Sequence, residues 1–176
     1  DGKIEVRSGK VEIGQGILTA LAQIVACELQ VRFERIFMVG ASTAVSPDEA
    51  VTSGSLSVQE SGTALRYAAA EARALLIGEA ARRKGIDAAR IDCDDGEFLL
   101  DGQPLGLNFW ALADAGLLER EATGLVAPLS STALSVVGAP VPRIDLPEKV
   151  FGLPRFVHDL ELPGMLHAAI LRPPSP

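Results

Sequence analysis

Cysteine and histidine are scarce in this sequence of 176 residues, which has two of each: Cys27, Cys93, His158 and His167. The two cysteines lie far apart, so they form neither a CxxC metal pair nor a disulfide framework, and we expect two reduced thiols. Two histidines are too few for a metal cage made of protein ligands. Both lie in a proline-rich tail, where a structural or surface role is expected.

Long apolar runs and clusters of basic residues are also missing. No stretch approaches the roughly 18 consecutive apolar residues of a membrane span, and no basic and apolar leader is present. The net charge is −7, and the scattered Lys and Arg residues do not suggest a nucleic-acid groove. Because the sequence starts at Asp1 and ends in a proline-rich run, we expect a segment of a longer protein, either cytoplasmic or periplasmic.

Familiar catalytic signatures are absent as well. No Ser/His/Asp order, no HExxH motif and no clustered pair of catalytic carboxylates stands out in the sequence. The glycines at 14 and 16 are not followed by the third glycine of a dinucleotide fingerprint or by the Gly-Lys-Ser/Thr of a phosphate-binding loop. No residue can therefore be assigned as a nucleophile or a general base.

What the sequence does contain is a hydrophobic fraction of 48%, enough for a buried core, and a clear order of periodic segments. Polar and apolar residues alternate over residues 3–13, which predicts two short strands or one bent strand. A helical face then starts at Ile17 and includes Leu21, Ile24, Val25 and Leu29. Residues 35–39 resemble a short buried strand, and residues 40–57 are rich in Ser, Thr, Gly and Pro, as loops are.

The second half of the sequence begins with the strongest helical pattern, over residues 58–84, with Gly85 as its expected C-cap. Residues 90–102 predict a hairpin that turns at Asp95-Gly96. A short helix is expected over 109–118 and a loop over 119–135. The fold class is therefore α+β, with helices packed on mixed sheets, and a proline-rich composition from residue 136 places a domain boundary near 135.

The first candidate site is Glu12-Ile13-Gly14-Gln15-Gly16, followed by Thr19, at the turn between the first strand and the first helix. Its glycines allow a tight turn and a close approach to a ligand, and the amides at the start of the helix favour an anionic group. The Gln15 amide can donate a hydrogen bond to an oxo group or accept one from a donor. The alternative is that this glycine-flanked segment is only a turn.

The second candidate site precedes the long helix and consists of small hydroxyl residues around a glycine: Thr52, Ser53, Gly54, Ser55 and Ser57. Hydroxyls and backbone amides at a helix N-terminus make a surface that binds anions such as phosphate. The alternative is that Ser55 or Ser57 is an ordinary helix N-cap. Two such helix starts in one small domain favour binding.

Three segments resemble the molybdenum-binding large subunits of the xanthine oxidase and aldehyde oxidase family. Residues 9–29 resemble the family's Gly-Gln-Gly segment, and residues 46–66 resemble its Thr/Ser/Gly-rich segment ahead of a long helix. Residues 137–176 resemble the opening of its hammerhead domain, through the motifs Arg143/Asp145, Lys149/Val150/Gly152, Phe156/Asp159 and Pro163–His167. The resemblance implies a partial molybdopterin-binding domain over residues 1–135 and a truncated hammerhead-like domain over 136–176.

The order of these segments favours one branch of the family. In xanthine oxidase the hammerhead domain comes before the Gly-Gln-Gly segment, whereas here it follows. This order is similar to that of isoquinoline 1-oxidoreductase and of nicotinate-dehydrogenase-type large subunits. One departure from the family is Cys27, where relatives usually carry an acidic or small residue.

The resemblance implies a parent protein that binds molybdenum on molybdopterin, in its cytosine dinucleotide form. Such a parent hydroxylates an N-heterocycle or an aldehyde with oxygen from water, and electrons leave through a [2Fe-2S] small subunit, in some cases onward to cytochrome c. In the family the residue that matches Gln15 hydrogen-bonds a molybdenum oxo ligand, and those that match Thr52–Ser57 lie near the pterin or its phosphates. The family's catalytic glutamate comes later in the polypeptide, so this segment is expected to need the remainder of its own large subunit for activity. The competing hypothesis is a non-catalytic binding or scaffold module that keeps the fold without the cofactor.

Overall fold

The computed structural model describes residues 2–113, 116–130, 132, 135–154 and 156–174. The chain divides into two compact units, Asp1–Arg143 and Ile144–Pro176. Among the described residues no helix is both long and apolar enough to cross a membrane.

The first unit opens with a strand–helix–strand motif. Strand β1 (Ile4–Arg7) leads to helix α1 (Ile17–Leu29), which returns the chain to strand β2 (Ile36–Val39) after a 3-10 turn, η1 (Phe33–Arg35). The two strands are parallel and in register from Ile4↔Ile36 to Arg7↔Val39, and parallel strands need a crossover of this kind. The predicted apolar face of α1 is confirmed, since Ile17, Leu21, Val25 and Leu29 are buried and Ile24 packs against the same core.

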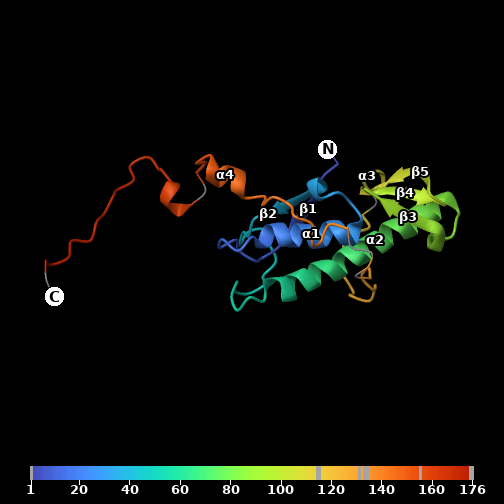
Figure 1. Ribbon diagram of the computed structural model, residues 1–176, viewed down its shortest axis with the longest axis horizontal. Helices are drawn as coiled ribbons and strands as arrows, with labels where there is room; N and C mark the ends of the chain where they lie inside the picture. Colours follow the sequence, from blue (N-terminus) through green and yellow to red (C-terminus); the bar gives the residue numbers. More distant parts are fainter. Residues whose placement is uncertain (1, 114–115, 131, 133–134, 155, 175–176) are drawn as a thin grey trace. The chain divides into compact units, whose positions relative to one another are not determined.

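The long helix extends from η2, a π-helical turn at Val58–Gly62, into α2 (Thr63–Lys84), and it packs against α1 (Figure 1). Gly62 makes close packing possible, because a Cβ atom there would lie 2.9 Å from the Ile24 Cδ1 atom. The helix ends at Gly85 in the left-handed conformation with φ 67°, as predicted. Several residues on the buried face of α2 are alanines, among them Ala69 and Ala80, and their small side chains allow neighbouring elements to pack close to the helix.

A three-stranded antiparallel sheet follows, made of β3 (Ile91–Asp94), β4 (Glu97–Leu100) and β5 (Gln103–Asn108), and it is preceded by a 3-10 turn, η3 (Ala88–Arg90). The predicted turn at Asp95-Gly96 is confirmed: φ is 47° and 80°, both positive, as a type I′ hairpin turn requires. The third strand was not predicted, because Pro104 and Gly106 interrupt its pattern; a proline is tolerated on an edge strand. The predicted helix over 109–118 is shorter than expected, since α3 is confined to Phe109–Leu112 and residues 114–115 lie outside the described part.

Two buried carboxylates anchor the loop after α3 to the helical layer. Glu28 accepts hydrogen bonds from the Arg66 side chain and the Leu129 amide. Glu71 accepts hydrogen bonds from the Thr123 amide and hydroxyl and from the Gly124 amide. These hydrogen bonds satisfy two carboxylates that would otherwise be costly to bury. They also hold the described part of this irregular loop against the helices.

The second unit contains one short helix, α4 (Leu146–Val150), and a 3-10 turn, η6 (Val157–Asp159). No described residue of this unit is buried, and apolar side chains such as Phe151 and Leu171 are 80% and 95% exposed. The sequence predicted that the opening of a further domain starts near residue 136, and this boundary stays a prediction.

Candidate functional site

The fold brings the two candidate loops together at the starts of the two long helices. The Val11 amide, just before Gly14-Gln15-Gly16, donates a hydrogen bond of 2.8 Å to Thr52 Oγ1 in the second loop. Segments about forty residues apart in the sequence thereby form one continuous surface. Neither loop could be placed against the other from the sequence alone.

Lys10 stabilises this junction from the buried side. Its side chain is only 2% exposed, and its ammonium group donates to the carbonyl oxygens of Glu49, at 2.7 Å, and Val51, at 3.2 Å. The same ammonium lies 3.3 Å from the Glu60 carboxylate on η2. A buried cation needs such partners, so Lys10 links the first loop, the second loop and the start of the long helix.

Glu49 completes the junction. Its carboxylate accepts hydrogen bonds from the Ser8 hydroxyl, at 2.7 Å, and from the Gly9 amide. Burial acts to raise the pKa of Glu49, but hydrogen bonds from Ser8 and Gly9, together with the charge of Lys10, outweigh it and leave the pKa below its ordinary value of 4.5. The carboxylate therefore stays ionised at neutral pH and holds the second loop in place.

The Gly-Gln-Gly turn is tight and largely exposed. Gly14 and Gly16 have φ values of 106° and 79°, which only glycine adopts freely, and Gly16 is the N-cap of α1. The Gln15 side chain closes the turn: its Oε1 accepts from the Ile13 amide at 2.7 Å, and its Nε2 donates to the Val11 carbonyl at 2.9 Å. An amide nitrogen has two hydrogens, so one donor position of Gln15 is left for a ligand.

The amides at the start of α1 have a partner that the sequence analysis did not predict. The Glu12 carboxylate accepts hydrogen bonds from the amides of Gly14, at 3.0 Å, and Gly16, at 2.8 Å, and a longer one from Leu18, at 3.4 Å. The expected anionic group at this helix start is therefore supplied by the protein itself. Arg143 lies on the same turn, with its guanidinium 2.7 Å from the Gly14 carbonyl and 3.5 Å from Glu12.

The second loop presents hydroxyl groups from a strained backbone. Gly54 and Ser55 both have positive φ, 65° and 58°, and Ser53, Gly54 and Ser55 are exposed, while Thr52 is half-buried. Ser57 is buried and occupies the N-cap position of η2, but its side chain makes no capping hydrogen bond. The simple N-cap alternative therefore does not account for Ser57. A π-helical turn directly after the loop is a feature that is often found at functional sites.

Apolar side chains surround the two loops and project into solvent. Ile13 is 71% and Val51 74% exposed, and Val11 and Val58 are about half exposed. The Val11–Thr52 hydrogen bond brings the two loops together, so these side chains flank one site, as they would at a contact with a ligand or another protein segment. The surface combines amide and hydroxyl donors with an apolar surround, which suits a flat, polar-edged ligand that carries phosphate.

Sequence reasoning missed Lys10 and Glu49, which stabilise this surface without facing the ligand. No local pattern singles them out, because their role depends on loops that meet only in the fold. Within the described part of the chain no group of three or more His, Cys, Asp or Glu residues could hold a metal ion.

Both cysteines are free thiols, as expected, and the structure places both in buried positions. Cys27 accepts hydrogen bonds from the amides of Val136, at 3.2 Å, and Val137, at 3.1 Å. Burial raises the pKa of the Cys93 thiol to about 11. Both cysteines lie outside the two candidate loops.

Comparison with known proteins assigns the fold. Residues 1–136 match the family described as "Molybdopterin cofactor-binding domain". The chain belongs to this family. The xanthine oxidase family resemblance seen in the sequence is thereby confirmed, and the two candidate loops both lie within the matched region.

Individual relatives agree with this assignment. The chain is 37% identical over 179 residues to a component of the nicotinate dehydrogenase of Pseudomonas putida, covering 99% of this chain and 15% of the relative. It is 27% identical over 209 residues to the beta component of the isoquinoline 1-oxidoreductase of Brevundimonas diminuta, covering 97% of this chain and 27% of the relative. The molybdopterin-binding chain therefore spans a small part of these longer relatives.

A solved structure shows the same fold. Reconstituted CO dehydrogenase from Oligotropha carboxidovorans superimposes with a TM-score of 0.56 and 29% sequence identity, over 65% of this chain and 14% of that one. The mixed helix and strand architecture is therefore that of a molybdenum-enzyme domain.

Proposed function

We propose that this chain forms one wall of the molybdopterin site in the large subunit of a molybdenum hydroxylase. The observation that carries the proposal is the meeting of the Gly-Gln-Gly loop and the Thr52–Ser57 loop through the Val11–Thr52 hydrogen bond. Family membership indicates which cofactor to expect. The contact between the two loops indicates which residues of the chain would face that cofactor.

The donor set fits such a cofactor. Gln15 would offer its second amide hydrogen to the molybdenum end of the cofactor without adding charge. The exposed Ser53 and Ser55 hydroxyls, with Gly54 between them, would bind the pterin or its phosphates. Gly14 and Gly16 allow close approach of the backbone, but their amides already donate to Glu12, so they would shape the turn rather than donate to an anion. Thr52 would hold the loops together, and Ser57 would lie behind them at the start of η2.

When bound, the cofactor supplies the two-electron oxidation in which a substrate carbon gains oxygen from water. The residues of this chain bind and orient the cofactor. They include no candidate general base, so the chain by itself is expected to be inactive, and proton transfer falls to the remainder of the large subunit.

The wider activity follows from the relatives. We infer that the parent protein oxidises an N-heterocycle or an aldehyde, because relatives carry the names nicotinate dehydrogenase, isoquinoline 1-oxidoreductase and aldehyde oxidase. A [2Fe-2S] subunit would take up the electrons, with cytochrome c as a later acceptor in this branch. The exposed apolar side chains around the loops are consistent with a surface that the remainder of the large subunit covers.

The test is the composition and activity of the purified parent protein. Elemental analysis should find about one molybdenum atom per large subunit, and acid hydrolysis should release cytidine monophosphate from a cytosine dinucleotide cofactor. The parent protein should oxidise at least one of nicotinate, isoquinoline and a simple aldehyde when it is assayed with an artificial electron acceptor. A parent protein that lacks both molybdenum and pterin would instead favour the scaffold alternative.

A further inference from the structure

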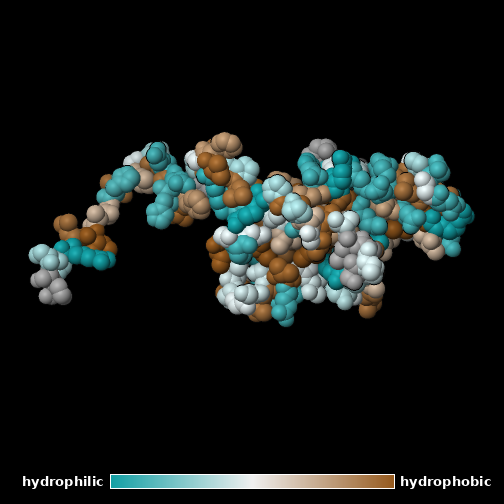
Figure 2. Space-filling view, viewed as in Figure 1, coloured by the Kyte–Doolittle hydropathy of each residue, from teal (hydrophilic) through white to brown (hydrophobic). Residues whose placement is uncertain are grey.

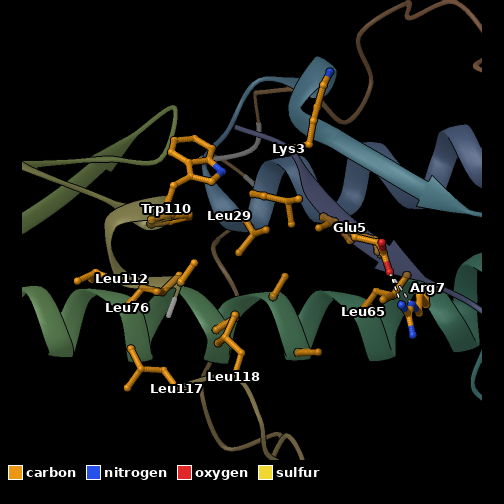
Figure 3. Close-up of a pocket in the computed structure, with 18 residues that line it drawn as sticks. Lys3, Glu5, Arg7, Leu29, Leu65, Leu76, Trp110, Leu112, Leu117 and Leu118 are labelled. Carbon is orange, nitrogen blue, oxygen red and sulfur yellow. Dashed lines mark hydrogen bonds and ion pairs between the residues drawn. The ribbon is translucent and has the colours of Figure 1, made fainter. Parts of the chain in front are cut away.

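An apolar groove of about 450 Å³ lies in the first unit, away from the two candidate loops. One side is formed by β1 and the other by α2, and Val25 and Leu29 of α1, residues of α3 and residues 117–118 complete the lining. Figure 3 shows Glu5 and Arg7 on the β1 side, Leu65 on α2 beside them, and Leu76 with Leu112 toward the other end. Figure 2 shows hydrophobic residues reaching the surface over the α1 and α2 layer of this unit.

The groove lies along the free edge of β1. Five consecutive residues, 3–7, line it, although successive side chains of a strand point to opposite faces. A cavity can touch all five only if it lies beside the strand. Strand β2 occupies the other edge, and among the described residues β1 has no second neighbouring strand. In a parallel ladder half of the backbone N–H and C=O groups of β1 therefore point away from β2 and toward the groove.

The helical side of the groove is shaped for a backbone at close range. Leu65, Ala69, Ala72 and Leu76 follow the spacing of one helical face, and all four line the groove. The two central alanines leave room, while the two leucines close the ends. No charged side chain of α2 lines the groove, so its occupant must present apolar groups to this side.

We propose that an extended segment from the remainder of the large subunit lies in this groove and adds a third strand to the β1–β2 sheet. Its alternate side chains would be apolar toward Ala69 and Ala72 and polar toward the exposed Glu5–Arg7 ion pair. The source is the same polypeptide, because the chain spans only 15% of the nicotinate dehydrogenase relative. In this respect the inference rests on the proposed function.

The first test is hydrogen exchange in the intact parent protein, followed by mass spectrometry. Peptides covering residues 3–7 should exchange about a hundredfold more slowly than expected for a strand with one free edge. Ala72→Phe fills the groove and should abolish this extra protection while α1 stays protected. Ala64→Phe, at an exposed position of the same helix, is the matched control and should change nothing.

The second test identifies the occupant and does not depend on a filled groove. Leu118, 55% exposed at the rim, is replaced by a photo-crosslinking phenylalanine (Leu118→benzoylphenylalanine) in the parent protein. A crosslink to a segment of the same large subunit outside residues 1–176 supports the proposal. A crosslink to a partner subunit or to a second copy, or none at all, would overturn it.

The two proposals fail separately. Molybdenum and pterin content, measured on the same preparation, tests the proposed function. A parent protein with full cofactor content but unprotected β1 amides would contradict only the third strand.

Discussion

At the scale of single residues, the candidate site depends on charged groups that do not themselves face the ligand surface. Lys10 is buried, and its ammonium group donates hydrogen bonds to the carbonyl oxygens of Glu49 and Val51. The Glu49 carboxylate accepts hydrogen bonds from the Ser8 hydroxyl and the Gly9 amide, which follow β1 directly. A glutamate and a lysine in these positions convert a serine-rich loop, which would otherwise be mobile, into a defined surface. The ligand-facing residues Gln15, Ser53 and Ser55 are placed by these partners.

Replacing Glu49 tests this role. Because the pKa of Glu49 is lowered in the folded chain, its contribution to stability is present above pH 4.5 and is lost as the pH falls below that value. Glu49→Gln removes the charge, and the expected loss at pH 7 is about 1–2 kcal/mol, allowing for partial exposure.

The measurement is thermal or urea unfolding of wild type and Glu49→Gln at pH 7 and pH 3.5. The difference between the two proteins should shrink at the lower pH, and Glu119→Gln in an exposed loop should match wild type at both. An equal difference at both pH values would show that the charge of Glu49 does not act as described.

At the scale of elements, Asp95 links the hairpin sheet to the strand–helix–strand motif through hydrogen bonds. Asp95, in the β3–β4 turn, accepts hydrogen bonds from the Arg32 amide and side chain and from two nitrogens of Arg35, all between 2.6 and 3.0 Å. The hydrogen bond from Arg35 is the main reason that the pKa of Asp95 lies well below its usual range. Arg35 also lies over the Trp110 ring, 4.3 Å from its centre.

Asp95→Ala should therefore loosen the junction between β3–β4 and η1. We expect a loss of about 1–2 kcal/mol in the free energy of unfolding, from the lost charge-assisted bonds and the positive φ that alanine tolerates poorly. Asp95→Asn keeps the turn preference and part of the hydrogen bonding, so it should cost less. If the alanine and asparagine variants unfold at the same denaturant concentration as wild type, the junction does not stabilise the fold.

The elements that sequence reasoning predicted are those with strong local signals. The face of α1, the extent of the helix from Val58, the Gly85 cap and the Asp95-Gly96 turn all depend on residues close in the sequence. Strand β5 and the early end of α3 were missed because neighbours in space decide them. The eight candidate site residues came from local motifs, whereas Lys10 and Glu49 are recognisable only once the loops meet.

At the scale of the molecule, the two units differ in how much they bury. The first has a core shared by α1, α2 and both sheets, with residues such as Leu21 and Phe98 fully buried. The second has no buried residue in its described part and presents large apolar side chains. Together with the apolar surround of the site and the groove along β1, this distribution is what a part of a larger molybdenum enzyme would show.

The most direct test of the central claim is the turnover of Gln15 variants of the parent protein. Gln15→Ala removes a donor to the cofactor, which is worth roughly 1.5–3 kcal/mol, so kcat should fall about ten- to a hundredfold. Gln15→Glu keeps the acceptor for the Ile13 amide but loses both donations of the side-chain amide, to the Val11 carbonyl and to the cofactor, so it should be slow as well. Gln103→Ala, exposed on β5, is the matched control. We expect folded, slow Gln15 variants with a normal control; wild-type turnover with full molybdenum content in both variants would show that Gln15 does not contact the cofactor.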